Sequence, residues 1–348
     1  MRCTKCVLPE SYPGIFFDEN GICNYCNDFF KNIGYEAKPD FDLLKKKLLN
    51  IFDKSRSSIH YNCLVPLSGG KDSSYILYLC MKEFKLKTLA LTFDNGFLSD
   101  IGRQNISNAI DILGVDHVYI KPSWPDMKIA YRIMLENYGF SCVFCDHSIF
   151  YISRYIQKQL DIPLLILGGS PRTQGKPSNL LYRIDYNAIY SAFKKSEFES
   201  FYFNNFPWFK TNIKDENPLG IVDVDRISLP YYIEWKEEEI PNILHNELKW
   251  KSCKETTEHV DCDVAKIKDY VANRIWGFTW KEIKYSDLIR DNQMTREDAT
   301  KLLKSDYKNL EKEPFYFEEY LKKLDYTRFQ FNEIVKNINK LPFKNINT

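Results

Sequence analysis

Six consecutive residues, SGGKDS from Ser68 to Ser73, combine two glycines, two hydroxyls, a lysine and an aspartate. They follow an apolar run at 63–67 and precede a helical pattern, so the sequence predicts a strand, a glycine turn and a helix N-terminus. Glycines let backbone N–H groups approach an anion closely, and the helix dipole favours negative charge there. Lys71 adds a cation and the two serines add hydroxyl donors. The segment therefore predicts a phosphate-binding site.

The loop differs from the common mononucleotide motif G-x-x-x-x-G-K-[ST], because Val65 stands five residues before Gly70 and Asp72 follows Lys71. It resembles the signature of the PP-loop ATP pyrophosphatases, which split ATP between the α and β phosphates and transfer AMP to a carbonyl oxygen. The resemblance implies that the loop holds the departing pyrophosphate, that Lys71 neutralises its developing charge and that Asp72 helps to hold Mg²⁺. The implied nucleotide-binding residues are Ser68, Gly69, Gly70, Lys71, Asp72 and Ser73.

Four cysteines near the N-terminus have the spacing C-x2-C-x16-C-x2-C; they are Cys3, Cys6, Cys23 and Cys26. Two such pairs joined by a hairpin deliver four thiolates to a tetrahedral Zn²⁺ ion without needing a hydrophobic core of their own. The spacing therefore predicts a structural zinc ribbon. An iron site and reduced thiols are the alternatives.

A further pair, Cys142 and Cys145, lies in the middle of the chain, and two cysteines alone rarely complete a metal site. We expect Cys262 to join them, with Cys253 as the other candidate. In PP-loop enzymes that thiolate tRNA, a C-x-x-C pair plus one distant cysteine resembles the arrangement that holds a [4Fe-4S] cluster. Buried thiols, zinc-linked thiols and a redox pair remain as alternatives.

The elements around these residues alternate between strand and helix patterns. We expect strands at 61–67, 88–93, 117–120 and 163–167, helices at 72–84 and 101–113, and a helix-rich stretch at 126–160. This order predicts an α/β fold with a doubly wound parallel sheet, whose ligands bind at the strand C-termini. There Asp94 could accept hydrogen bonds from ribose or adenine, while Gly168 and Gly169 would let a substrate approach the backbone. An ordinary turn at 95–96 is the alternative to a nucleotide contact.

The chain divides into four expected segments. They are a zinc ribbon at 1–30, a helical connector at 31–58, a PP-loop domain of the adenine nucleotide alpha hydrolase type at 59–240 and a helical C-terminal region at 241–348. The aromatic stretch 193–209 is predicted to be packed core, with a lid or subunit contact as the alternative.

The composition limits the partners. Lys and Arg number 48 against 47 Asp and Glu, a net charge of +1, which argues against a long nucleic acid as the usual ligand. No stretch has the length and apolarity of a membrane span, and ten cysteines in such a chain suit metals better than disulfides. We expect a cytoplasmic protein without membrane contact; a homodimer is one option that the sequence leaves open.

Several motifs recur together in the N-acetyl sugar amidotransferases, and the chain resembles that family over most of its length. They are RCTKCVLP at 2–9, FDENGIC at 17–23, the SGGKDS loop, GVDH at 114–117, Asp261-Cys262, Asp269-Tyr270, WGF at 276–278 and MTREDA at 294–299. The resemblance implies an enzyme that adenylates the acetamido oxygen of a nucleotide sugar, after which ammonia displaces AMP and leaves an acetamidino group. Such products serve surface glycan or nonulosonic acid biosynthesis. It also implies separate glutaminase and ammonia-channel subunits.

The Cys142–Cys145 pair departs from that family pattern and favours a second reading, a [4Fe-4S]-dependent sulfur transferase that thiolates a tRNA base or small molecule. Both reactions share an adenylated intermediate and require ATP and Mg²⁺. We expect nitrogen transfer as the first reading, with Lys71, Asp72 and the three cysteines as the reactive residues. A nucleotide-binding role without catalysis is a distant third reading.

Overall fold

The computed structural model describes residues 1–32, 40–139, 141–169, 186–196, 198, 204–210, 222–223, 225–253 and 259–338. Its centre is a six-stranded sheet with the order β3-β2-β1-β4-β6-β5. The strands are β1 (Cys63–Pro66), β2 (Thr88–Phe93), β3 (Asp116–Ile120), β4 (Leu165–Leu167), β5 (Val222–Asp223) and β6 (Arg226–Ser228). All neighbours pair in parallel except β5, which is antiparallel to β6. The predicted α/β class with a parallel sheet is confirmed.

The two faces of the sheet enter two separate cores because successive side chains of a strand point to opposite sides. Leu64, Leu89 and Leu91 join the core on one face, whereas Val65 and Ala90 join the core on the other. Burial on both faces explains why these strands read as continuous apolar runs rather than alternating patterns.

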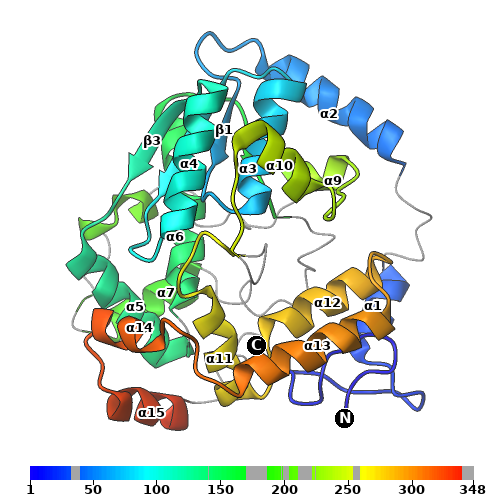
Figure 1. The fold of residues 1–348 in the computed structure, drawn as a ribbon, viewed down its shortest axis with the longest axis vertical. Coiled ribbons are helices and arrows are strands. Elements are labelled where there is room, and N and C mark those ends of the chain that lie inside the picture. The colour runs from blue at the N-terminus through cyan, green and yellow to red at the C-terminus, as the bar shows by residue number, and fades with distance from the viewer. Residues whose placement is uncertain are drawn as a thin grey trace.

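Helices cover both faces of the sheet (Figure 1). On one side lie α2 (Phe41–Ser55), α3 (Lys71–Tyr78), α4 (Asp100–Leu113) and α10 (Ile240–Leu248), whose buried residues share one core. The core on the other side includes α5 (Trp124–Tyr138), α6 (Cys142–Gln159), α7 (Tyr186–Lys194) and α11 (Ala265–Trp276). The chain leaves β1 toward β2 and later returns to β4 on the opposite side of β1. In parallel sheets, ligands commonly bind at such a reversal, which here lies at the end of β1.

The N-terminal segment packs against two helices from the last third of the chain (Figure 1). The N-terminal segment with α1 (Asn24–Asn32) lies against α12 (Trp280–Arg290) and α13 (Arg296–Leu310), and α14 (Phe317–Lys323) and α15 (Arg328–Asn337) follow. Arg2 forms an ion pair with Glu282, and the Val7 amide donates to Ser286 Oγ at 3.3 Å. The guanidinium of Arg296 donates to the carbonyl oxygens of Cys3 and Cys6. The cysteine-rich segment is therefore docked on the helical C-terminal region.

Several details differ from the sequence expectations. The expected helix at 72–84 is α-helical only to Tyr78 and ends in a π-helical turn, Leu79–Glu83. Strands β5 and β6 were missed, because two or three residues are too few to show a period. In the aromatic stretch, Phe193, Phe206 and Phe209 are fully buried around Phe144, as expected for core, while Phe201, Tyr202 and Phe203 lie outside the described residues.

The remaining short elements are α9 (Leu229–Tyr232) and the 3-10 turn η3 (Pro207–Lys210). Helix α10 contacts both α3 and α4, although its sequence lies at the start of the expected C-terminal region. Among the described helices, none combines the length and apolarity needed to cross a membrane.

Glu282 of α12 links the N-terminal segment to α13 through Arg2 and Tyr307. Its side chain is fully buried and accepts from the Thr279 amide at 2.7 Å and the Tyr307 hydroxyl at 2.8 Å, in addition to its pair with Arg2. Glu282→Ala should lower the free energy of unfolding by about 3 kcal/mol, because it leaves buried donors unpaired. Denaturant unfolding measures this, with Glu297→Ala, which removes an exposed pair with Lys301, as the control. Equal effects of the two changes would contradict the role of Glu282.

Candidate functional site

The predicted phosphate-binding segment, residues 68–73, forms a turn between β1 and the start of α3 and is called the phosphate loop below. Gly69 has φ +80°, and a Cβ added there would lie 2.3 Å from the Gly102 carbonyl oxygen, so only glycine fits. The Gly69 carbonyl accepts from Asn105 Nδ2 and from Trp250 Nε1, both at 3.0 Å. Gly70 then caps α3 with an extended backbone. The backbone of the loop is thus fixed before any ligand binds.

The hydroxyls of the loop bond to each other. Ser73 Oγ lies 3.1 Å from Ser68 Oγ and accepts from the Ser68 amide at 3.2 Å. The Gly70 amide donates to Ser68 Oγ at 3.3 Å. These bonds keep both hydroxyls beside the N-terminus of α3. An anion bound there would replace the serine oxygens as the acceptor for the loop N–H groups.

Lys71 is almost completely buried, with 7% of its side chain exposed, yet it carries its charge between two carboxylates. It pairs with Glu237, from the segment before α10, and lies 3.5 Å from Asp72 Oδ1. Trp235 packs edge-on against Tyr75 of α3 with centroids 5.2 Å apart, which anchors that segment. Glu237 was not singled out from the sequence, because nothing in its surrounding acidic run distinguishes it from a solvated face.

The end of β4 lies beside the loop, as expected from the sheet order. A Cβ added to Gly168 would be 3.9 Å from Asp72 Cβ, and the Gly169 carbonyl accepts from Ser228 Oγ. Asp94 lies after β2, but its buried carboxylate bonds to Arg103 at 2.9 Å and to Tyr119 at 2.6 Å. Burial would raise the pKa of Asp94, but these bonds outweigh it and hold the pKa below its usual value. Its contact with ribose or adenine stays a prediction.

The second group of cysteines gathers around Asn95, the residue after Asp94. The Asn95 side-chain oxygen accepts from the Phe97 amide at 2.8 Å, so its Nδ2 faces sulfur, 3.4 Å from Cys145 Sγ and 4.0 Å from Cys262 Sγ. Cys142 lies one turn before Cys145 on α6, and side chains three residues apart share a helix face. The structure thus brings together the pair at 142–145 and Cys262, the third member expected from the sequence.

Burial makes these thiols poor acids. It raises the pKa of Cys142 to about 11 and raises the pKa values of Cys145 and Cys262 as well. Burial also acts to lower the pKa of Lys268, but nearby Cys142 and carboxylates outweigh it, so the net shift is upward. Thiolates here would need a compensating cation such as a metal or iron cluster.

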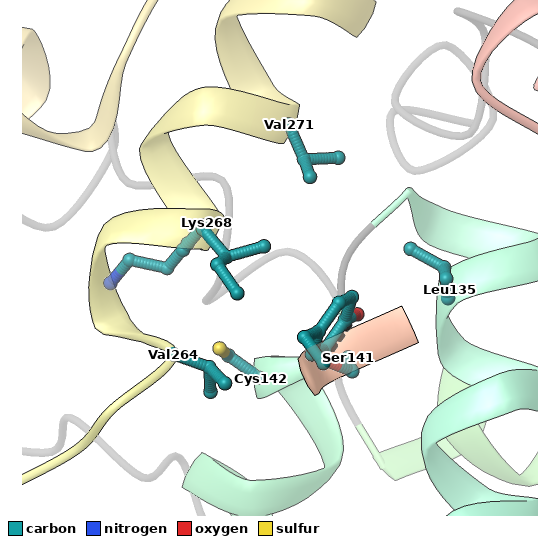
Figure 2. A pocket seen from close by; sticks show the side chains of 8 residues that line it. Leu135, Ser141, Cys142, Val264, Lys268 and Val271 are labelled. Atoms are coloured by element: carbon teal, nitrogen blue, oxygen red, sulfur yellow. Dashed lines mark hydrogen bonds between the residues drawn. The ribbon is translucent and has the colours of Figure 1, made fainter. Parts of the chain in front are cut away.

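A small cavity adjoins Cys142 between α6 and α11 (Figure 2). Its volume is about 10 Å³, which is space for about one water-sized molecule. It is lined by Leu135, Ser141, Cys142, Val264, Ile267, Lys268, Val271 and Tyr320. Lys268 was not identified from the sequence, since one lysine in a helical pattern carries no signal of its own.

The four N-terminal cysteines fit a tetrahedral metal. All are buried, and their sulfur atoms lie within 4.8 Å of one another. The distances Cys3–Cys26 and Cys6–Cys23 are 4.0 and 3.8 Å, close to the separation of about 3.8 Å that Zn–S bonds of about 2.3 Å require. Arg290 of α12 donates to Cys26 Sγ at 3.9 Å and would offset part of the negative charge of four thiolates. The four cysteines are therefore arranged so that they can hold a metal ion; zinc as its occupant stays a prediction.

One short segment, residues 259–263, connects the phosphate loop with the cysteines. Leu98 pairs with Cys262 in an antiparallel bridge, and the Ser99 amide donates to the Asp261 carbonyl at 3.0 Å. A Cβ added to Gly70 would lie 3.1 Å from both carboxylate oxygens of Asp261. The sequence resemblance marked Asp261-Cys262, but only the fold shows that its two side chains serve different sites.

Comparison with known families identifies one part of the chain. Residues 233–346 match the family described as LPS biosynthesis protein WbpG-like, C-terminal domain. An uncharacterized protein of Methanocaldococcus jannaschii is 27% identical over 129 residues, which cover 36% of this chain and 45% of that protein. The chain thus spans less than half the length of that relative.

Three solved structures are similar to this chain. NH3-dependent NAD synthetase from Campylobacter jejuni is 18% identical and covers 49% of this chain and 77% of its own, with a TM-score of 0.32. NMN synthetase from Francisella tularensis is 15% identical, covering 78% and 94%, with a TM-score of 0.38. The U34-tRNA thiolase NcsA from Methanococcus maripaludis, solved with its [4Fe-4S] cluster, is 17% identical, covering 87% and 88%, with a TM-score of 0.35. These values are too low to carry an argument about the reaction.

Cys3→Ser should remove the metal and lower the free energy of unfolding by at least about 3 kcal/mol, because metal binding is coupled to folding of the ribbon. Elemental analysis and thermal unfolding measure both effects. Cys63→Ser is the control, since Cys63 is a buried cysteine of β1 outside both cysteine groups. A Cys3 variant that keeps one metal per chain and its melting temperature would refute the site.

Lys71→Ala should slow AMP formation about a hundredfold, because one oriented cation at a developing charge contributes about 3 kcal/mol. Quenched-flow measurement of AMP with the accepted substrate tests this. Lys54→Ala on the exposed face of α2 is the control. Near-normal AMP formation in the Lys71 variant would remove that residue from the reaction.

Proposed function

We propose that this chain, which joins a WbpG-like C-terminal domain to a PP-loop fold, is an ATP-dependent amidotransferase acting on an N-acetyl sugar, most simply a nucleotide sugar. The observation that carries the proposal is the contact of that domain with the phosphate loop. Asp261 and Glu237, both within residues 233–346, reach Gly70 and Lys71. A domain of lipopolysaccharide biosynthesis is thereby coupled to an ATP site.

The reaction needs ATP because an amide carbonyl is a weak electrophile and its oxygen a poor leaving group. In the proposed first step the acetamido oxygen attacks the α-phosphorus, the bond to the bridging oxygen breaks, and pyrophosphate leaves. Ammonia then adds to the activated carbon and AMP departs with the former acetamido oxygen. The added nitrogen releases its surplus proton to the solvent, and the product carries an acetamidino group.

The chain supplies positions and charge for these steps. The N-terminus of α3 and Lys71 would bind the departing pyrophosphate. The hydrogen bonds to the Gly69 carbonyl hold the loop backbone in place for this. Mg²⁺, when bound, would neutralise phosphate charge, and the exposed Asp72 offers it an oxygen ligand. Gly168 packs closely on Ile76 and lies beside Asp72, so the end of β4 adjoins the proposed magnesium ligand.

Sulfur transfer is the second candidate, favoured by the convergence of Cys142, Cys145 and Cys262 near Asn95. Three thiolates suit a [4Fe-4S] cluster with one iron open, which would supply a bound sulfur nucleophile. The shared adenylation step would be unchanged, and the acceptor would be a tRNA base or a small molecule. The two reactions therefore differ in the nucleophile and in the acceptor, and share the adenylation step.

A labelled substrate distinguishes them directly. We expect that a nucleotide N-acetyl sugar carrying heavy oxygen in its acetamido group, incubated with ATP, Mg²⁺ and ammonium, transfers the label to AMP. The product should gain heavy nitrogen when the ammonium is labelled. Mass spectrometry of AMP and of the sugar reports both. Label retained in the sugar while ATP is cleaved would contradict the proposal.

The same incubation tests the alternative. Protein purified without oxygen should be assayed with sulfide in place of ammonium, and its iron and acid-labile sulfide measured. A thiolated product, together with iron lost in Cys142→Ser, would establish sulfur transfer instead. The separate glutaminase and ammonia-channel subunits stay a prediction; free ammonium replaces them in this assay.

A further inference from the structure

A carboxylate beside the phosphate loop has no part in the reaction described above. Asp261 lies with its carboxylate over Gly70, the residue that caps α3. Among the residues that the structure describes, this carboxylate accepts no hydrogen bond and has no cation at ion-pair distance. Its backbone is held firmly, since the Ser99 amide donates to its carbonyl oxygen at 3.0 Å.

The position of this carboxylate is fixed by close backbone packing. A Cβ added to Gly102 would lie 2.9 Å from Asp261 Cα, so α4 leaves no space for the segment to shift toward it. On either side, Ser99 Oγ donates to the Val260 carbonyl and the Asp263 amide donates to the Phe97 carbonyl at 3.0 Å. The side chain is therefore presented to the loop by a braced segment.

The charges around the loop do not suit a phosphate alone. Lys71 is one cation, and it faces Asp72 and Glu237, while Asp261 lies over the adjoining glycine. One ammonium among three carboxylates leaves these four side chains with two net negative charges. A pyrophosphate group entering here would be repelled unless a divalent cation came with it.

We propose that Asp261 is a second carboxylate ligand, with Asp72, for the Mg²⁺ that accompanies the nucleotide. The inference rests on the proposed ATP site and deepens it. Mg²⁺ prefers a few carboxylate oxygens together with phosphate oxygens and water. Asp261 provides such an oxygen without breaking any existing contact, whereas Glu237 is already paired with Lys71. The C-terminal domain thereby completes the nucleotide site of the parallel sheet.

The test is the affinity for ATP with and without Mg²⁺, measured by calorimetry on the full chain. Asp261→Asn should weaken binding of ATP with Mg²⁺ about tenfold, because it removes one metal ligand. When a chelator removes Mg²⁺, the affinity for ATP should be unchanged or higher in the variant, because the substitution also removes a negative charge. Mn²⁺ in place of Mg²⁺ gives an independent readout, since the fraction of free Mn²⁺ seen by electron paramagnetic resonance should rise in the variant.

Asp263→Asn is the matched control, because it removes the same charge two residues away on the same segment. It should leave both affinities within about twofold of the parent. The Asn substitution at 261 keeps the backbone bond to Ser99, and an unchanged melting temperature would verify the fold.

The opposite outcomes are equally informative. Tighter binding of ATP with Mg²⁺ in Asp261→Asn would show that the carboxylate occupies the place of a phosphate, and would overturn the proposal. Equal affinity of parent and variant would overturn it as well. If the parent protein binds no ATP with or without Mg²⁺, the proposed function itself fails, so the two failures are distinguishable.

Discussion

The close approach of three backbones at the N-terminus of α4 organises the rest of the molecule. Gly69 of the phosphate loop touches the Gly102 carbonyl, and Gly102 in turn touches the backbone of Asp261. Side chains at either glycine would push these layers apart. Because the contacts are backbone to backbone, they fix the spacing between the loop, α4 and the segment that contains Asp261.

That constraint explains why the phosphate loop and the cysteines near Asn95 lie at the same edge of the sheet. The segment 259–263 crosses from the loop to the turn after β2, so Asp261 faces Gly70 while Cys262 faces Asn95. A parallel sheet gathers ligands at its strand C-termini, and here a segment from outside the sheet closes that edge. The phosphate loop and the cysteines at 142, 145 and 262 consequently lie close to each other.

The N-terminal cysteines have a different relation to the site. Their backbone carbonyls accept from Arg296 and their sulfur atoms face Arg290, so the metal site braces α12 and α13. Those helices belong to the same C-terminal region that supplies Asp261 and Lys268. The four-cysteine cluster thus supports the region that contains Asp261 through packing, without direct contact with the phosphate loop.

The sequence by itself determined the elements whose signal is local. The SGGKDS turn, the apolar strands and the four-cysteine spacing each specify a backbone geometry or a ligand set within a short stretch. It also indicated Cys142, Cys145 and Cys262 as one group, although their separation along the chain left Cys253 as a rival. Helix-period patterns likewise gave the C-terminal helices, whereas β5 and β6 were too short to detect.

Only the tertiary structure decided which polar side chains meet. Glu237, Asp261, Asn95 and Lys268 lie in ordinary acidic, turn or helical stretches, and their importance depends on partners tens to hundreds of residues away. Asp94 shows the converse, because its predicted place at a strand end is correct but Arg103 and Tyr119 bond its carboxylate. Local sequence encodes backbone geometry, whereas the pairing of charges depends on which distant segments the fold brings together, as the packing of Gly69 and Asp261 on Gly102 of α4 illustrates.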